Sequence, residues 1–403
     1  MRHGRWLAAL TLVLGLHVSV GQAHEAAIEV HEAAPQPVLP SVQAAVQQLI
    51  DLQAVAGAVV LVAQHGDIVH FQAQGLQEVE TQTPMQLDTL FRLYSMTKPI
   101  TSVATLMLME RGLVGLDDPI GEHLPELANL QVYESRTEQV APKRPVTVRE
   151  LLRHTSGMTY GFFSAGPVDR LYLRSHPLLA RNQGAMLSRL GALPLAHHPG
   201  ERWHYGVSTD VLGALVERVS GQSLGAFLQD EIFEPLGMVD THFQVPADKV
   251  DRFASTYGLL LAPIQSASNS PYLRADRLES GGGGLVSTAP DYLRFSQMLL
   301  QGGSHNGHRL LQPETVAAMT SNQLPDGVRT AGLYGFGYGV HVTMRNQLVG
   351  PRKGQYGWNG AAGTHFWVDP ERSLVVVALS QHQPYNTQLK LALTPVVYEA
   401  LPD

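Results

Sequence analysis

The sequence predicts an α+β fold: an antiparallel sheet flanked by helices, plus an inserted and mainly helical lobe. Three observations support this prediction. Apolar runs on both sides of a His65-Gly66-Asp67 turn indicate a β-hairpin near the start of the chain. Strand signals are scarce from 116 to 274, and a second hairpin pattern returns at 364–380. Two lobes interleaved in sequence, with a ligand cleft between them, are therefore expected.

Length and composition limit the class of protein. The chain has 403 residues, of which 44% are hydrophobic and 16% charged, as in globular proteins. A formal net charge of −7 argues against nucleic acid as a partner. A chain of this length is expected to form two or three structural units.

The first residues predict export. Arg2 and Arg5 precede an apolar run from 6 to 20, and Gly21-Gln22-Ala23 is typical of a cleavage site, so 1–23 is interpreted as a signal peptide. The run is short for a membrane span, so no stable membrane insertion is expected after cleavage. A flexible lead-in is expected at 24–40. The chain has no cysteine, which excludes disulfides and cysteine-bound zinc. We expect a secreted or periplasmic protein.

The sheet lobe is predicted at 41–115 and 275–403. Apolar residues at helical spacing predict a helix over 41–55, and two strands follow at 56–64 and 68–72. A helix from Ser95 to about Arg111 is apolar on all sides and is expected to be buried. After 275, Thr288 is expected to cap a helix that runs to about Leu300. Strands at 364–368 and 373–380 and a last helix at 387–400 complete the lobe.

The mainly helical lobe is predicted at 116–274. Thr147-Val148-Arg149-Glu150 is a capping box that starts a short helix ending near Gly157. Further helices are predicted at 208–219 and 224–232. The loops between Tyr160 and Pro199 are expected to line a pocket.

Ser95 and Lys98 are the candidate reactive pair. Three residues apart at the start of a helix, their side chains share one face with Cβ atoms about 5–6 Å apart. A lysine can act as the base that activates a serine hydroxyl when burial or a nearby cation lowers its pKa. The chain has five lysines, and only Lys98 has a serine three positions before it. By itself, however, the pattern is short and weak.

Other candidate sites are less favoured. Gly221-Gln222-Ser223-Leu224-Gly225 fits the nucleophile elbow of α/β-hydrolases, but a helix rather than a strand is predicted before it, so we interpret it as a helix–helix turn. The four glycines at 281–284 lack the ending of a phosphate-binding loop, and close backbone packing near the cleft is expected instead. No His-Glu-x-x-His spacing is present, so no metal and no cofactor are predicted. His154 and His365 are expected to be structural.

The order of motifs resembles the serine β-lactamase and penicillin-binding protein superfamily, and most closely its branch of family VIII carboxylesterases and related acyltransferases. The resemblance covers about 41–400. The motifs are Ser95-Met96-Thr97-Lys98, Leu151-Leu152-Arg153-His154-Thr155-Ser156-Gly157-Met158, Tyr205 before Ser208-Thr209-Asp210, Ser280-Gly281-Gly282-Gly283-Gly284, and Gly357-Trp358-Asn359-Gly360. Five motifs in one order are far more specific than any single one.

The resemblance implies a β-lactamase-like fold and a role for each matching residue. Ser95 matches the nucleophile, Lys98 its partner base and Tyr205 the tyrosine that carries protons. The N–H groups of Ser95 and Ala361 match the oxyanion hole.

The third motif departs from the β-lactamase pattern, since Trp358-Asn359-Gly360 stands where those enzymes have Lys-Thr-Gly. Losing that lysine removes a cation suited to the carboxylate of a β-lactam or peptide, so the substrate pocket at Trp358, Asn359 and Gly360 is expected to favour neutral esters. Gly206 and Val207 also replace the usual second-motif residues.

The sequence therefore predicts an exported serine hydrolase that cleaves small carboxylic esters through an acyl-enzyme on Ser95. Two alternatives remain: β-lactamase or D,D-peptidase activity on the same scaffold, and a non-catalytic ligand-binding or sensor protein. The expected partner is a small-molecule ester, and the oligomeric state is not predicted.

Overall fold

The computed structural model describes residues 36–401 except 331, 333 and 349. The predicted signal peptide and most of the lead-in lie outside the described residues. By its contacts, the chain from Gln36 onward forms one compact unit. The division into a sheet lobe and a helical lobe stays a prediction.

An eight-stranded sheet forms the base of the fold, and every neighbouring pair in it is antiparallel. The first two strands of the chain lie between the C-terminal strands and the short edge strand β3. In spatial order the strands are β12 (Tyr334–Phe336), β13 (His341–Thr343), β14 (Tyr356–Gly360), β15 (Thr364–Asp369), β16 (Leu374–Ser380), β1 (Gly57–Gln64), β2 (Asp67–Glu78) and β3 (Thr83–Pro84).

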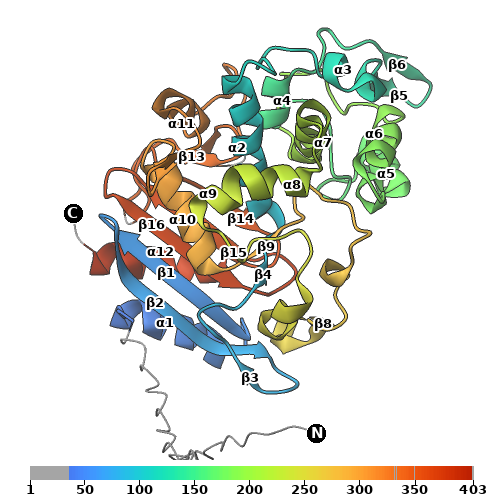
Figure 1. Cartoon of the computed structure of the whole chain (residues 1–403). Coiled ribbons are helices and arrows are strands. Elements are labelled where there is room, and N and C mark those ends of the chain that lie inside the picture. Colours follow the sequence, from blue (N-terminus) through green and yellow to red (C-terminus); the bar gives the residue numbers. More distant parts are fainter. Residues whose placement is uncertain (1–35, 331, 333, 349, 402–403) are drawn as a thin grey trace, which may run out of the picture. The chain divides into compact units, whose positions relative to one another are not determined.

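Both faces of the sheet are covered, because side chains alternate between the faces along each strand. On β1, Val59 and Leu61 belong to the larger core, which also holds helices α2 and α10. Val60 and Val62 point the other way, into a smaller core formed with α1 and α12. Figure 1 shows α1 and α12 on one side of the sheet and α10 on the other. Burial on both faces accounts for the continuous apolar run of β1.

The helices are mostly short, and α2 is buried along most of its length, as its apolar sequence predicts. They are α1 (Pro40–Asp51), α2 (Thr97–Glu110), α3 (Ile120–His123), α4 (Val148–Leu152), α5 (Pro167–Ser175), α6 (Gln183–Gly191), α7 (Ser208–Ser220), α8 (Leu224–Leu228), α9 (Glu234–Leu236), α10 (Ala289–Leu300), α11 (Pro313–Met319) and α12 (Gln388–Ala400). Short two-stranded ladders complete the chain: β4 (Phe91–Arg92) with β9 (Val286–Ser287), β5 (Val132–Ser135) with β6 (Glu138–Val140), β7 (Thr256–Tyr257) with β8 (Pro263–Gln265), and β10 (Ser304–His305) with β11 (His308–Arg309).

Most predicted elements are present, and the differences have local causes. The capping box at Thr147 and Glu150 is confirmed, as is the Thr288 cap of α10. The first helix stops at Asp51, shortly before Gln53 adopts a left-handed φ of 53°. The helix predicted at 224–232 is divided: α8 passes into a wider π turn at Gln229–Phe233.

One further finding concerns membranes. Among the described residues, no helix has both the length and the apolar composition that crossing a bilayer requires.

Candidate active site

Ser95 lies in the middle of a single 3₁₀ turn, Tyr94–Met96, that leads into α2. Tyr94 has a φ of 45°, a left-handed conformation that costs a non-glycine residue about 1 kcal/mol. Hydrogen bonds hold the turn on both sides: the Leu93 N–H donates to the carbonyl of Leu285 (2.9 Å), and the Tyr292 hydroxyl donates to the carbonyl of Met96 (2.8 Å). The surroundings therefore fix the position of the serine.

Arg92 anchors the strand that enters this turn. Its guanidinium is fully buried, donates to Gln381 Oε1 (3.1 Å) and Ser270 Oγ (3.1 Å), and lies 4.0 Å from the ring centroid of Phe253. Burial lowers the pKa of Arg92 to about 10. Removing either acceptor would leave a buried donor unpaired, so the segment before Ser95 has little freedom to move.

Lys98 is fully buried and its Nζ donates to three neutral acceptors. They are Ser95 Oγ (3.1 Å), the Tyr160 hydroxyl (2.8 Å) and the Gly282 carbonyl (2.6 Å). The predicted pairing of Ser95 with Lys98 across one helical turn is therefore present in the geometry. Three donors meeting three acceptors satisfy an ammonium group completely.

Tyr160 is a site residue that the sequence did not single out. It follows α4 at the start of the loops expected to line a pocket, and Gly157 just before it turns the chain with a φ of 88°. Burial raises the pKa of the Tyr160 phenol well above its usual value, and the charge of Asp210 raises it further. Tyr160 is therefore held as a neutral phenol.

The glycine turn at 281–284 positions the third acceptor of Lys98. Thr101 of α2 donates to the Gly281 carbonyl (2.8 Å), and the Gly282 N–H donates to Asp210 Oδ1 (3.1 Å). A Cβ on Gly282 would lie 2.4 Å from Asp210 Oδ2. The expected close backbone packing is confirmed, and it directs the Gly282 carbonyl at Lys98. Burial raises the pKa of Asp210, while the charge of Lys98 opposes that shift.

Tyr205 lies beside Lys98 without bonding to it in the described part of the chain. Its ring centroid is 4.8 Å from Lys98 Nζ, and its hydroxyl accepts a hydrogen bond from Trp358 Nε1 (3.3 Å). Gly206, next to it, has a structural reason to be glycine, since a Cβ there would lie 2.3 Å from the Met158 carbonyl. The phenol that hydrogen-bonds to Lys98 is thus Tyr160, whereas Tyr205 contacts Lys98 through its ring.

Strand β14 carries Trp358, Asn359 and Gly360 to the site, and these three residues are unpaired on the side that faces β13. The strand pairs with β15 along its whole length, but β13 pairs only with Tyr356 and Gly357. The hairpin of β12 and β13 turns back at 337–340, where Gly339 has a φ of 86° and donates to the Leu152 carbonyl. Trp358–Gly360 therefore form a local edge inside a central strand.

Gly360 lies against the segment that leads into the serine turn. A Cβ there would lie 2.2 Å from the carbonyl oxygen of Leu93, two residues before the nucleophile. Glycine therefore lets β14 pack directly against the serine turn. Ala361 follows Gly360 in the turn between β14 and β15, next to this contact.

Aromatic side chains surround the reactive groups. The Tyr205 ring contacts those of Tyr160, Phe163, Trp203 and Trp358, with centroids 5.5–6.0 Å apart. Phe162 and Phe163 are 62% and 60% exposed, so they form an apolar rim that solvent reaches. Such a lining suits an apolar part of a small molecule.

His154 and His365 lie near the site and are buried and neutral. His154 packs against Tyr205 and Phe336, and its Nδ1 accepts from the Gly206 N–H (3.5 Å). Burial lowers its pKa well below the usual value, and burial lowers that of His365 to about 3. Asn359 Oδ1 lies 2.9 Å from His365 Nδ1. Both side chains orient neighbours, as expected of structural residues.

The competing serine is placed away from this cluster. Ser223 caps α8, its Oγ accepting from the Ala226 N–H (3.2 Å), and the helix α7 precedes it. The strand that a nucleophile elbow requires is therefore missing at this position, as the sequence predicts.

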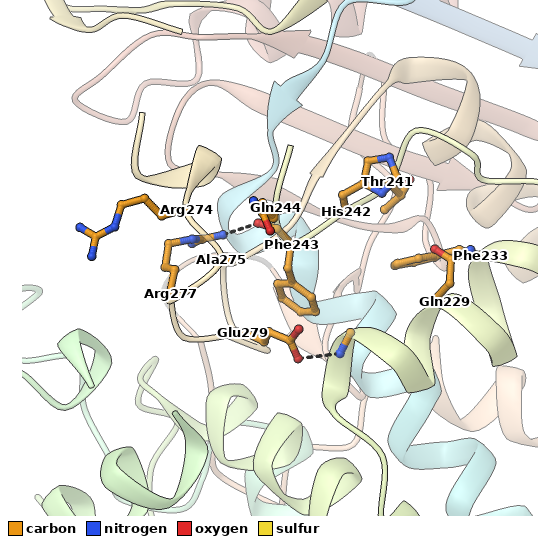
Figure 2. A pocket seen from close by; sticks show the side chains of 11 residues that line it. Gln229, Phe233, Thr241, His242, Phe243, Gln244, Arg274, Ala275, Arg277 and Glu279 are labelled. Carbon is orange, nitrogen blue, oxygen red and sulfur yellow. Dashed lines mark hydrogen bonds between the residues drawn. The ribbon is translucent and has the colours of Figure 1, made fainter. Parts of the chain in front are cut away.

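A separate pocket of about 220 Å³ lies on the other side of the glycine turn (Figure 2). Two of its charged residues bind the backbone: Arg277 donates to the carbonyls of Phe243 and Gly284 (2.7 Å each), and Glu279 accepts from the Gly225 N–H (2.8 Å). Figure 2 shows the bond from Arg277 to the Phe243 carbonyl and the bond between Glu279 and the Gly225 N–H. These side chains therefore hold the backbone near the turn that carries Gly282. Ser95 is not among the residues that line the pocket.

Comparison with known families decides the class of protein. A model described as Beta-lactamase matches residues 42–396. The chain belongs to the β-lactamase family. This agrees with the resemblance seen in the motifs and with the antiparallel sheet flanked by helices, so the predicted fold class is confirmed.

Relatives of this β-lactamase family member include esterases and acyltransferases. The chain is 34% identical over 377 residues to Esterase EstB of Burkholderia gladioli, covering 85% of this chain and 90% of that protein. It is 30% identical over 407 residues to monacolin J acid methylbutanoyltransferase of Aspergillus terreus, covering 92% and 96%. A solved structure titled "EstCE1, a hydrolase with promiscuous acyltransferase activity" is 30% identical, with a TM-score of 0.79 and coverage of 89% and 98%.

Proposed function

We propose that this member of the β-lactamase family is a serine esterase that forms an acyl-enzyme on Ser95. The observation that carries the proposal is the contact between Lys98 Nζ and Ser95 Oγ at 3.1 Å, inside a site where Lys98 is fully buried. Relatives named as an esterase and an acyltransferase support the same class of reaction.

In the first step, the Ser95 oxygen attacks the ester carbonyl carbon while its proton passes to Lys98 in the amine form. The tetrahedral oxyanion is received by the N–H groups of Ser95 and Ala361, the donors that the serine turn and the end of β14 offer. The proton then moves to the alkoxide as the C–O bond breaks. Tyr160, which contacts Lys98, and Tyr205, beside it, are the phenols that carry it.

In the second step, water attacks the acyl-enzyme and Ser95 regains its proton. An alcohol in place of water gives acyl transfer by the same route, and the apolar rim at Phe162 and Phe163 suits an organic acceptor. The name of the Aspergillus relative favours testing this acceptor reaction as well.

The experiment compares two serines and two substrates. Purified protein should turn over a short-chain 4-nitrophenyl ester rapidly and a chromogenic cephalosporin slowly. Ser95→Ala should abolish ester turnover, whereas the matched variant Ser223→Ala should keep most of it.

Each alternative gives another outcome. Faster cephalosporin turnover would support a β-lactamase or D,D-peptidase, and a stoichiometric adduct on Ser95 without turnover would support a sensor. Full activity of Ser95→Ala would refute the site. Mass spectrometry of the labelled peptide after a mechanism-based inhibitor locates the acyl group directly.

Export is proposed together with this activity. Because Arg2 and Arg5 precede an apolar run and a small-residue segment ends at Ala23, the mature chain should start at His24. N-terminal sequencing of protein from a secreted or periplasmic fraction checks it, and an intact Met1 in the cytoplasm would contradict it.

A further inference from the structure

A pocket of about 300 Å³ adjoins the open edge of β14. It shares Trp358 and Asn359 with the candidate active site, and Trp358 also donates to Tyr205. The rest of its wall comes mainly from the hairpin of β12 and β13 and from α12, which contributes Lys390. A molecule bound along Trp358–Gly360 therefore has this pocket directly beside it.

Lys390 brings an uncompensated positive charge to the pocket. Among the described residues, its Nζ makes no hydrogen bond or ion pair, and no aspartate or glutamate lines the pocket. Part of the Lys390 side chain is exposed, but its ammonium is deep enough that burial lowers its pKa to about 8. Leaving a cation without a partner in such a place is costly unless a ligand supplies the opposite charge.

The described residues that line the pocket offer Lys390 no negative charge. Burial lowers the pKa of both His341 and His365, and the charge of Lys390 lowers both further, so the two imidazoles are neutral. His341 lines the pocket, is 6% exposed, and has no hydrogen-bond partner for Nε2 among the described residues. A second buried polar atom thus lacks a partner at this pocket.

We propose that Lys390, with His341 beside it, binds a carboxylate carried by the substrate, so that the enzyme prefers esters bearing a negative charge. The proposal rests on the proposed esterase function and differs from the sequence-based expectation of neutral esters. The third motif lacks the lysine that binds a carboxylate in β-lactamases, but α12 supplies a cation on the other side of the same strand.

The carboxylate can belong to the acyl part or to the alcohol part of the ester, and two substrate pairs distinguish them. Mono-4-nitrophenyl glutarate against 4-nitrophenyl pentanoate tests the acyl part, and 4-acetoxybenzoate against its methyl ester tests the alcohol part. We expect the protein to prefer the charged member of one pair. A charge-assisted hydrogen bond corresponds to about a 10- to 100-fold preference.

Lys390→Met should remove this preference by lowering kcat/KM for the charged ester about 10- to 100-fold while leaving the neutral ester within about twofold. Lys390→Arg should restore most of the preference. Lys143→Met is the matched control, because it removes the same charge from a 70% exposed side chain and should change neither member of a pair.

A binding measurement separates this inference from the esterase proposal. Glutarate and benzoate should each be tested for raising the melting temperature of the full chain carrying Ser95→Ala, and at least one should do so. The rise should disappear when Lys390→Met is added. Binding without ester turnover would overturn the esterase and keep the anion site. Ester turnover with no charge preference, or with Lys390→Met lowering both members of a pair equally, would overturn the anion site.

Discussion

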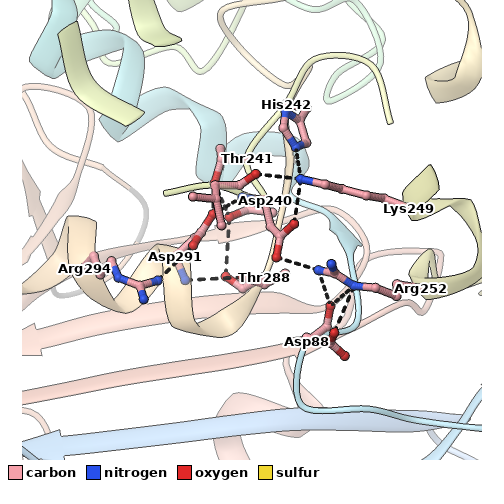
Figure 3. Close-up of polar contacts among 11 residues, drawn as sticks. Asp88, Asp240, Thr241, His242, Lys249, Arg252, Thr288, Asp291 and Arg294 are labelled. Carbon is pink, nitrogen blue, oxygen red and sulfur yellow. Dashed lines mark hydrogen bonds and ion pairs between the residues drawn. The ribbon is translucent and has the colours of Figure 1, made fainter. Parts of the chain in front are cut away.

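Two groups of polar and charged side chains in this protein contain a lysine with different partners. In the Asp240 cluster (Asp88, Asp240, Lys249, Arg252, Asp291 and Arg294), each cation contacts a carboxylate. Lys249 Nζ lies 2.9 Å from Asp240, Arg252 lies 2.6 Å from the same carboxylate, and Arg294 lies 3.0 Å from Asp291. Figure 3 shows how these pairs join the segment at Asp240 to the start of α10.

Around Lys98 the direct partners are all neutral: a serine hydroxyl, a tyrosine hydroxyl and a backbone carbonyl. None of the ion pairs among the described residues involves Lys98, although Asp210 is close enough for the charge of Lys98 to act on its pKa. Asp210 is occupied by Ser280 and the Gly282 N–H instead. Among the described residues, no carboxylate forms an ion pair with Lys98, whereas Lys249 lies 2.9 Å from Asp240. Lys249 thus takes part in ion pairs, whereas Lys98 is the lysine to which the proposed function assigns the reaction.

The largest effect is expected when each of the two lysines is replaced by methionine in a separate variant. Lys98→Met should lower kcat for a 4-nitrophenyl ester about a thousandfold or more, since it removes the group that takes the Ser95 proton. Lys249→Met should leave kcat within about twofold and lower the melting temperature instead. Equal losses of activity in both variants would contradict the distinction, and circular dichroism checks that each variant is folded.

A smaller loss is expected when one neutral partner of Lys98 is removed. Tyr160→Phe deletes the hydroxyl that accepts from Lys98 at 2.8 Å, so kcat should fall about 10- to 100-fold. Tyr205→Phe deletes the acceptor of Trp358 and tests the phenol that the sequence singled out. Steady-state kinetics of both variants rank the two tyrosines. An unchanged kcat for Tyr160→Phe would remove Tyr160 from the proton path.

Breaking the Asp240 cluster should affect stability alone. Asp240→Ala leaves Lys249 and Arg252 without their shared carboxylate, and because these side chains are mostly buried the free energy of unfolding should fall by about 2 kcal/mol. Urea denaturation measures this change. Asp276→Ala, which opens the exposed pair with Arg274, is the control and should cause no measurable loss. A large fall in kcat for Asp240→Ala at low temperature would contradict a purely structural role.

The smallest effect concerns pH. Burial raises the pKa of Asp291 to about 6, so between about pH 6 and 4 the folded state holds a proton that the unfolded state has released. Protonation of Asp291 therefore stabilises the folded state increasingly as the pH falls through that range. His242 acts in the opposite direction, because burial lowers its pKa to about 4 and stability is lost as the pH falls below 6.5.

Asp291→Asn cannot titrate, so on acidification from pH 6 to 4 the variant should lose stability more steeply than the original chain. Urea midpoints at several pH values measure the two slopes. Parallel slopes would show that Asp291 has an ordinary pKa. Asp276→Asn is again the exposed control.

Sequence alone predicted the parts of the site that depend on short spacings. Ser95 and Lys98 are one helical turn apart, and strands β1, β15 and β16 follow from their apolar runs between turn signals. Tyr160 was not predicted because its contact with Lys98 spans 62 positions and depends on how the chain folds back after α4. No spacing rule connects such residues.

Lys390 shows the same limit more clearly. It lies in the first turn of α12, which packs with α1 against the face of the sheet opposite α10. A lysine in such a helix usually extends into solvent. Lys390 lines a pocket beside the site because residues of the β12–β13 hairpin and Trp358 form other parts of the same pocket wall. The Asp240 cluster likewise joins segments whose proximity the sequence pattern does not encode. The proposed roles of Tyr205 and Ala361 stay predictions.

The hairpin of β12 and β13 has a consequence for substrate size. Its tip ends where β14 has three residues still to run, so the length of this hairpin sets how much of β14 a substrate can reach. Three further residues in each arm would continue the ladder over Trp358–Gly360 and close the edge, whereas a shorter hairpin would expose Gly357 as well. The width of molecule that the site accepts is therefore adjustable by insertion or deletion at a turn, without exchanging any residue that touches Ser95.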